Sequence, residues 1–284
     1  PDVRSSGDLS APVQVVLSTW LSDDGAVWQM RGGPIFAQPR RISGAVLAAG
    51  TGATAVIAWN EASATAAVVT GHLAATTDGA NWSEVPAGAL PSGFTVTDLA
   101  AAPGGGFLVS GKSIVDGLAS AALLRSDAAA RAWTPVALPQ DPSLDVPERA
   151  SVVWHLVPGA TGLLAVGDSP TRELWWWSAD GRRWTAVPDF SPVGASGCPG
   201  STQPCGAYAD GLVAGDGERI VAVGGAGASG AAVTWAARDG ALWQRLRTPS
   251  QVPRGRPIAI TLLPGGILLT DSTGVWFGEA GSAP

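Results

Sequence analysis

Histidine, cysteine and tyrosine are scarce in this chain, whose 284 residues include two His, two Cys and one Tyr. Most pairs of nucleophile and base, and most zinc sites, draw on these residue types, so the composition excludes their common forms. The formal net charge is −6, which argues against a nucleic-acid-binding protein, since such proteins normally show a basic surface. The sequence therefore predicts no metal, no cofactor and no nucleic-acid partner.

Long apolar runs are also missing. No run reaches the roughly 18 residues that a membrane-spanning helix needs, and the stretch 258–269 is interrupted by Pro264 and two glycines. No membrane-spanning segment is therefore predicted. The chain begins at Pro1 without a signal peptide, so we expect it to have been excised or processed from a longer precursor.

The two cysteines, Cys198 and Cys205, enclose a polar loop rich in turn-forming residues. Their spacing matches neither a CxxC redox motif nor a zinc pattern. We expect a disulfide, with two free thiols as the alternative. A disulfide requires an oxidising compartment, so the predicted location is extracytoplasmic, secreted or anchored through a segment outside this sequence.

A repeat of about fifty residues runs along the chain. Segments 22–28, 76–82 and 178–184 share a Ser or Thr, an Asp-Gly pair and a closing Trp; segment 238–243 follows this pattern, and segment 126–133 is a looser copy. The closing tryptophans follow one another at intervals of 51 to 59 residues. An Asp-Gly pair between two apolar runs is the strongest short signal for a β-hairpin.

Each repeat also holds two earlier apolar runs joined by a Pro/Gly turn, as in residues 99–109. Four antiparallel strands in about 40–50 residues are typical of a propeller blade. We therefore predict an all-β fold, a single β-propeller over residues 1–284 with strands A to D in each blade. Counting favours five blades, with N-terminal strands (a C–D pair at 13–30) closing the last one. Residues 274–279 look like an extra C strand, which makes six blades the alternative.

These repeats resemble those of the Asp-box (BNR-type) β-propeller proteins, with one residue fewer between Asp and Gly. In that family the Asp caps backbone N–H groups of the C–D turn and the aromatic residue packs between strands. The resemblance implies this structural role for Asp24, Asp78, Asp180 and Asp239, and for Trp28, Trp82, Trp133, Trp184 and Trp243.

The family includes sialidases, sortilin-like receptors and photosystem assembly factors, so the resemblance does not choose a function. Sialidases need a Tyr nucleophile, a Glu partner and three Arg. The sole tyrosine, Tyr208, lies two residues before Asp210, and the usual Arg-Ile-Pro motif is absent. We therefore predict no catalytic residues and expect that the chain is not an enzyme.

Two aromatic segments have structural and functional interpretations. Residues 175–177 are three consecutive tryptophans, for which we expect packing between blades rather than a carbohydrate-stacking platform. His155 follows Trp154 on an innermost strand, and we expect it in the channel wall rather than as a metal ligand.

The D–A and B–C loops lie at one end of every blade and hold most of the variable charged residues. The candidate binding residues there are Arg40, Arg41, Asn60, Glu61, Lys112, Asp116, Glu148, Arg149, Asp168, Arg172, Glu173, Arg254, Arg256 and Asp271. Both signs of charge are mixed, which favours a protein or peptide partner, with a glycan as the alternative. We predict a noncatalytic, extracytoplasmic binding or scaffold propeller, the ectodomain or sensor part of a bacterial envelope protein. The alternative is a carbohydrate-active hydrolase or lectin of sialidase-like fold.

Overall fold

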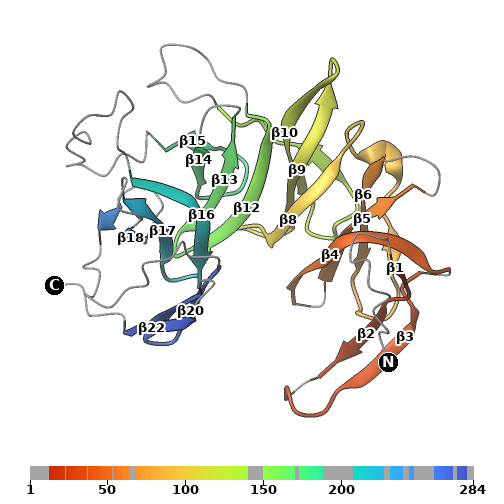
Figure 1. Cartoon of the computed structure of the whole chain (residues 1–284). Helices are drawn as coiled ribbons and strands as arrows, with labels where there is room; N and C mark the ends of the chain where they lie inside the picture. The colour runs from red at the N-terminus through yellow and green to blue at the C-terminus, as the bar shows by residue number, and fades with distance from the viewer. Residues whose placement is uncertain are drawn as a thin grey trace. The chain divides into compact units, whose positions relative to one another are not determined.

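Figure 1 shows the computed structural model of the chain. The structure describes residues 13–22, 24–36, 38–52, 54–63, 68–139, 150–169, 173–187, 207–226, 231–238, 243–245, 259–270 and 274–279. Two compact units follow one another along the chain, residues 1–136 and 137–284. Apart from one 3₁₀ turn, η1 (Ala87–Ala89), the regular elements in these ranges are β-strands.

The first unit contains a five-stranded sheet in the order β1-β4-β5-β6-β7, a four-stranded sheet in the order β11-β10-β9-β8, and the hairpin β2-β3. The five-stranded sheet is made of β1 (Val13–Val15), β4 (Arg40–Thr51), β5 (Thr54–Ala62), β6 (Val69–Thr76) and β7 (Ser83–Glu84). The four-stranded sheet is made of β8 (Thr95–Ala101), β9 (Phe107–Val115), β10 (Leu118–Ser126) and β11 (Trp133–Pro135). The hairpin joins β2 (Ser18–Leu21) to β3 (Gln29–Pro34).

The second unit contains two four-stranded sheets, each in sequence order, and one three-stranded sheet. The first sheet is made of β12 (Val152–Gly159), β13 (Gly162–Asp168), β14 (Glu173–Ser178) and β15 (Thr185–Ala186). The second is made of β16 (Ala207–Gly215), β17 (Ile220–Ala226), β18 (Ala231–Ala237) and β19 (Gln244–Arg245). The third is made of β20 (Ala259–Leu263), β21 (Gly266–Thr270) and β22 (Val275–Glu279).

The antiparallel four-stranded sheets confirm the predicted all-β propeller fold. Two segments are assigned differently from the sequence-based prediction. Residues 13–30 do not form one C–D pair, because β1 pairs with β4 while β2 and β3 form their own hairpin. Residues 274–279 supply β22, which is the third strand of the last sheet rather than an extra one. The number of blades and the closure of the ring remain predictions.

The turns lie where the Asp-Gly pairs predict them. Gly25, Gly79 and Gly181 have φ angles of 73°, 71° and 68°, in the left-handed region that glycine adopts readily. In the β9–β10 hairpin both turn residues are left-handed, Asp116 at 53° and Gly117 at 76°. Two such residues form the type I′ turn, whose twist matches that of the flanking strands.

Apolar side chains from neighbouring sheets form the core of each unit. In the first unit Val56 and Leu73 pack in one cluster with Phe107 and Leu124 of the next sheet, together with the repeat residue Trp133. In the second unit the corresponding cluster joins β12–β14 to β17, and the repeat residue Trp243 packs against it. Burial between sheets on both faces explains why most strands are continuous apolar runs.

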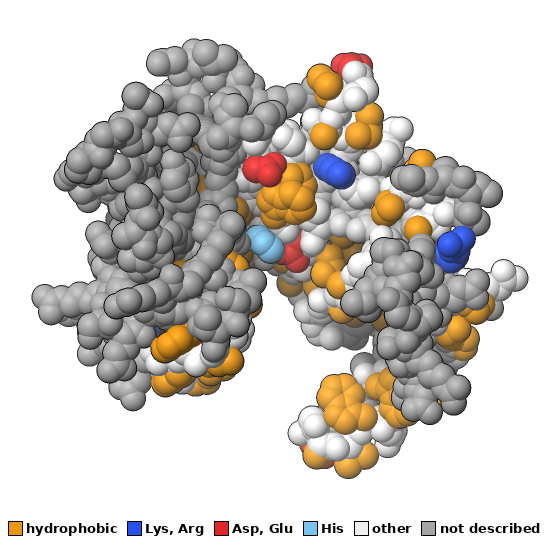
Figure 2. Space-filling view, viewed as in Figure 1, with side chains coloured by type: hydrophobic (Ala, Val, Ile, Leu, Met, Phe, Trp, Pro, Cys, Tyr) orange, Lys and Arg blue, Asp and Glu red, His pale blue; other side chains and the backbone are white. Residues whose placement is uncertain are grey.

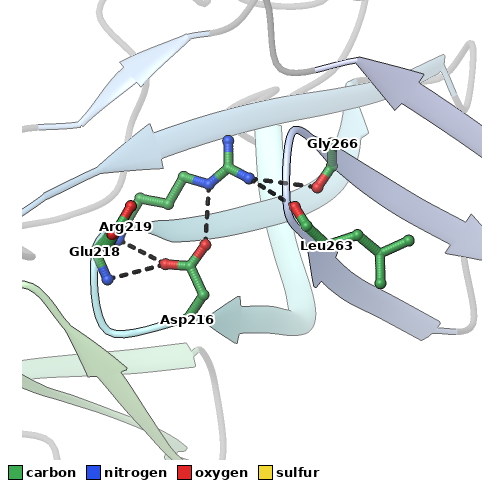
Figure 3. A network of polar contacts seen from close by, with 5 residues as sticks. All are labelled: Asp216, Glu218, Arg219, Leu263 and Gly266. Carbon is green, nitrogen blue, oxygen red and sulfur yellow. Dashed lines mark hydrogen bonds and ion pairs between the residues drawn. The ribbon is translucent and has the colours of Figure 1, made fainter.

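One arginine joins two sheets of the second unit (Figure 3). Arg219 lies in the β16–β17 turn, directly before β17, and its Nε lies 3.2 Å from Asp216 Oδ2. Its Nη2 donates to the backbone oxygens of Leu263, at 3.2 Å, and Gly266, at 3.4 Å. The guanidinium therefore holds the β20–β21 hairpin against the β16–β17 hairpin.

The pairing of β4, β8, β12 and β16 with the next strand shifts register once in each sheet, and in β8 and β12 the shift is a β-bulge of one extra residue. The register shifts lie between Ser43 and Leu47 in β4, Val96 and Asp98 in β8, Val153 and His155 in β12, and Ala209 and Leu212 in β16. A bulge turns a side chain out of the regular alternation, and bulges are frequent beside active sites. In β12 the bulged residue is Trp154.

Candidate functional site

Three of the predicted binding residues occupy corresponding places in their blades. Glu61 lies near the end of β5, Lys112 lies in β9 and Asp168 ends β13, and each is paired with the beginning of its blade's first strand. On the face drawn in Figure 2, the charged side chains of the described residues lie singly among hydrophobic and uncharged ones. Each candidate is therefore best judged by its own contacts.

Arg40 is held by two carboxylates in the first unit. Its Nη1 lies 3.4 Å from Glu61 Oε2, and its Nη2 lies 2.5 Å from Glu84 Oε1. The guanidinium carbon is 5.7 Å from the centre of the Phe36 ring. A ligand that bound Arg40 or Glu61 would have to compete with these ion pairs.

His72 lies between this ion-pair group and a buried indole. Its ring stacks on Trp59, with ring centres 5.4 Å apart, and its Nε2 is 3.6 Å from Glu61 Oε2. Burial lowers the pKa of His72, and this effect exceeds the opposite effect of Glu61 and Glu84; Arg40 lowers the pKa further. At neutral pH the imidazole is therefore uncharged.

The other described candidates of the first unit lie in strands or in a hairpin turn. The Asn60 side chain accepts from Val96 N, at 2.8 Å, and donates to Val96 O, at 2.7 Å, so it joins β5 to β8. Arg41 lies in β4 opposite Gln14. Asp116 lies in the β9–β10 turn.

Several predicted residues lie outside the described residues. These are Glu148, Arg149, Arg172, Arg254, Arg256 and Asp271, the repeat residue Asp239, and the predicted disulfide partners Cys198 and Cys205. Glu173 begins β14 and is the register partner of Asp168.

The repeat aspartates cap their turns. In Asp24, Asp78 and Asp180 the Oδ1 atom accepts hydrogen bonds from the backbone N–H groups two and three residues ahead, at 2.7–2.9 Å. These backbone hydrogen bonds are the main reason that the pKa of each carboxyl lies below its usual range. The carboxylates are exposed, yet in each of them the Oδ1 atom is occupied by the turn.

The repeat tryptophans differ in exposure. Trp133 and Trp184 are buried, and Trp82 is half-buried, with its Nε1 donating to Thr19 Oγ1 at 2.7 Å. Trp28 is 57% exposed, and its Nε1 donates to Gly25 O. The consecutive tryptophans of β14 are covered too: Trp175 and Trp176 are buried and Trp177 is half-buried.

Trp154 presents an exposed aromatic face beside a carboxylate in the second unit. It is 44% exposed at the bulge of β12, and its Nε1 donates to Asp168 Oδ2 at 3.1 Å. The next residue, His155, is exposed as well. We call Trp154, His155 and Asp168 the Trp154 site.

An indole face beside a carboxylate suits a sugar ring. The C–H face of a sugar packs on an aromatic ring, and its hydroxyl groups donate hydrogen bonds to carboxylate oxygens. The hydrogen bond from Nε1 fixes the indole relative to Asp168. The site therefore offers a stacking surface with an acceptor held at its edge.

Among the described residues, no group of three or more His, Cys, Asp and Glu is placed to hold a metal ion. In the same part of the chain, no helix has the length and apolar character needed to cross a bilayer.

No protein-family model matches the chain, and no curated protein matches it. Solved structures do resemble it. A sialidase from Trypanosoma rangeli is 11% identical, over 95% of this chain and 50% of that chain, with a TM-score of 0.49. A xyloglucanase from Xanthomonas campestris is 19% identical, over 78% of this chain and 34% of that chain, with a TM-score of 0.45. The β-propeller domain of a protease from Pyrococcus furiosus is 10% identical, over 85% of this chain and 82% of that chain, with a TM-score of 0.44.

The chain thus spans about a third of the xyloglucanase chain and half of the sialidase chain. At these identities the likeness concerns the fold.

The prediction that the chain is not an enzyme is wrong, because the solved structures that it resembles include a xyloglucanase and a sialidase. The noncatalytic binding function predicted with it finds no support among them. The prediction rested on the scarcity of His, Cys and Tyr. Glycoside hydrolysis needs two carboxyl groups instead, and the chain contains 23 Asp and Glu, so its composition does not exclude that reaction.

Trp154 is the site residue that the sequence analysis missed. The available signal was the pair Trp154-His155, two large side chains in succession near the start of an innermost strand. The bulge that exposes Trp154 depends on how β12 pairs with β13, and the residue pattern of one strand does not show it.

Proposed function

We propose that this protein is a carbohydrate-active propeller, a glycoside hydrolase that binds its glycan at the Trp154 site. The observation that carries the proposal is the exposed indole of Trp154 at the bulge of β12, hydrogen-bonded to Asp168. In this proposal the indole stacks on a sugar ring, and Asp168 accepts hydrogen bonds from its hydroxyl groups.

The reaction requires a second carboxyl group, and Glu173 stands directly opposite Asp168 in the β13–β14 register. In glycoside hydrolases one carboxylic acid protonates the leaving glycosidic oxygen. The other carboxylate attacks the anomeric carbon or activates a water, with the two groups about 5–10 Å apart. Asp168 and Glu173 are the pair to which we assign these roles.

We further propose that the chain belongs with the Asp-box propellers and acts outside the cytoplasm. The first proposal is supported by the capped turns at Asp24, Asp78 and Asp180. The second is supported by the pairing that the sequence predicts for Cys198 and Cys205, since disulfides persist in oxidising compartments.

The test combines a glycan array with hydrolysis of aryl glycosides and oligosaccharides. Trp154→Ala should weaken glycan binding by about tenfold, the effect expected when an aromatic contact is lost. Asp168→Asn and Glu173→Gln should each abolish turnover while glycan binding remains. Trp28→Ala is the matched control, because Trp28 is also exposed but its Nε1 donates to a backbone oxygen.

Three results would count against the proposal. Turnover that survives both carboxylate substitutions would remove the assigned roles. Binding that depends on Trp154 without any turnover would make the protein a lectin. Glycan binding lost equally in Trp28→Ala and Trp154→Ala would place the glycan elsewhere.

A further inference from the structure

We infer that the three-stranded sheet of the second unit pairs, along β22, with β22 of a second copy of this chain. In the described part of the chain no strand pairs with the outer edge of β22. The corresponding strands β6, β10, β14 and β18 each pair with a further strand. An unpaired edge presents backbone N–H and C=O groups to which another strand can bond. This inference is independent of the proposed function.

The strand β22 lacks the features that protect the other sheets. The last strands of the larger sheets, β7, β11, β15 and β19, are two or three residues long. Short edge strands are one way in which proteins prevent pairing with another chain. By contrast, β22 is five residues long, contains no Lys or Pro, and pairs with β21 without a register shift. Val275 and Phe277 in this strand are 66% and 58% exposed. A regular, apolar and exposed edge of this kind favours pairing.

A second copy of β22 fits this edge in one register. Two antiparallel copies overlap along all five residues only when Phe277 stands opposite Phe277 of the second copy. The two rings then form an aromatic cross-strand pair, which stabilises a sheet. Trp276 stands opposite Gly278 on the other face. A Cβ at Gly278 would meet no atom within 4 Å, so the glycine leaves open space that the opposite indole can cover.

The N-terminal strands, which the predicted closure of the ring would bring to the last blade, have partners in the first unit. β1 pairs with β4, and β2 pairs with β3. Leu17 and Ile35, on either side of the hairpin, pack in the cluster around Trp59, and Thr19 accepts the Trp82 hydrogen bond. A second copy offers the same unpaired β22 edge instead. Pairing of two identical edges is isologous, so it closes as a two-fold dimer.

The first experiment uses the whole chain without substitutions. Sedimentation velocity should show a monomer at low concentration that becomes a dimer as the concentration rises. Hydrogen exchange with mass spectrometry should show slower exchange at residues 275–279 in the dimer, because the outer amides of β22 become hydrogen-bonded. Residues 259–263 are the internal control, because β20 lies on the other side of β21 and its exchange should not change with concentration.

Two pairs of variants test the register. Phe277→Lys replaces the aromatic pair by two lysines directly opposite each other, so it should raise the dissociation constant of the dimer at least about tenfold. Val275→Lys is the matched control, because its two lysines lie four residues apart along the strands, about 14 Å at roughly 3.4 Å per residue. Under mild oxidation Phe277→Cys should form a 277–277 disulfide between copies, whereas Val275→Cys should form none between its own positions.

The remaining outcomes would each overturn the inference. A chain that stays monomeric at every concentration has no such dimer, and slow exchange of residues 275–279 in that monomer would support closure by an N-terminal strand. A dimer that Phe277→Lys and Val275→Lys weaken equally does not pair in this register. A dimer weakened by Trp20→Ser and not by Phe277→Lys would place the contact on the β2–β3 hairpin, where Trp20 is 54% exposed.

Discussion

His72 shows how strongly one side chain depends on its surroundings in this fold. Trp59, on which it stacks, is fully buried, while Arg40, Glu61 and Glu84 lie along the same sheet. Burial is the largest influence and lowers the pKa of His72 below its usual 6.5. In the unfolded chain the imidazole takes up its proton near that usual value.

This difference predicts a pH dependence of stability. As the pH falls below about 6.5, the unfolded chain binds a proton at His72 before the folded chain does. The free energy of unfolding therefore decreases from this pH down to the lower pKa that His72 has in the folded chain. His72→Gln should therefore flatten the fall in unfolding free energy between about pH 8 and pH 5, measured by chemical denaturation. His155→Gln is the control, because His155 is exposed. Equal slopes in the wild type and His72→Gln would refute the argument.

At the scale of residues, the sequence predicted the turn chemistry well. The Ser/Thr, Asp and Gly spacing implies a carboxylate that caps the turn, and Asp78 and Asp180 do so. The partners of Arg40 were not predictable, because Glu61 and Glu84 come from strands whose neighbours only the folded sheet defines. The exposure of Trp154 was not predictable either, because it depends on a register shift in the pairing of β12 with β13.

At the scale of elements, strands were predictable because Gly and Pro bound short apolar runs and Asp-Gly pairs join them. The contacts that hold neighbouring sheets together were not predictable from the sequence. Asn60 uses both polar atoms of its amide on Val96, and Arg219 reaches two backbone oxygens of the next sheet (Figure 3). Nothing in the local pattern distinguishes these two residues from other polar residues near strand ends.

The Arg219 contact makes a prediction about the β20–β21 hairpin. Arg219→Ala removes both hydrogen bonds to Leu263 and Gly266, so residues 259–270 should exchange their amide hydrogens faster. Hydrogen exchange with mass spectrometry measures this directly. Arg182→Ala is the matched control, since Arg182 is an exposed arginine in the turn of another blade. Unchanged exchange in Arg219→Ala would show that the hairpin is held by its apolar contacts alone.

At the scale of the whole molecule, the repeat was sufficient to predict a propeller of four-stranded blades, whereas the N-terminal segment was assigned less well. Its residues 13–30 supply β1, which pairs with β4, and much of the β2–β3 hairpin. Val15 and Leu17 pack against the cluster around Trp59, and Thr19 accepts the Trp82 hydrogen bond. These contacts arise after the chain has folded back on itself, and strand patterns alone do not specify them.

Deleting residues 1–31 tests the weight of these contacts. The deletion uncovers the edge of β4 and part of the Trp59 cluster, so we expect aggregation or a melting temperature lower by more than about 5 °C. Deleting residues 1–12, which ends before β1, is the control. A monomeric protein with an unchanged melting temperature after the longer deletion would make the N-terminal strands an appendage of the first unit.

The bulges in the first strands of the blades have a consequence for how such a scaffold diversifies. A bulged residue stands outside the hydrogen-bonded ladder, so it can be exchanged without shifting the pairs on either side. Thr97 in β8 and Trp154 in β12 occupy this place in their respective blades. Mutation at such positions can change which ligand the protein binds while the strand register stays the same. Natural variation and laboratory libraries can therefore both alter binding at the same small set of positions.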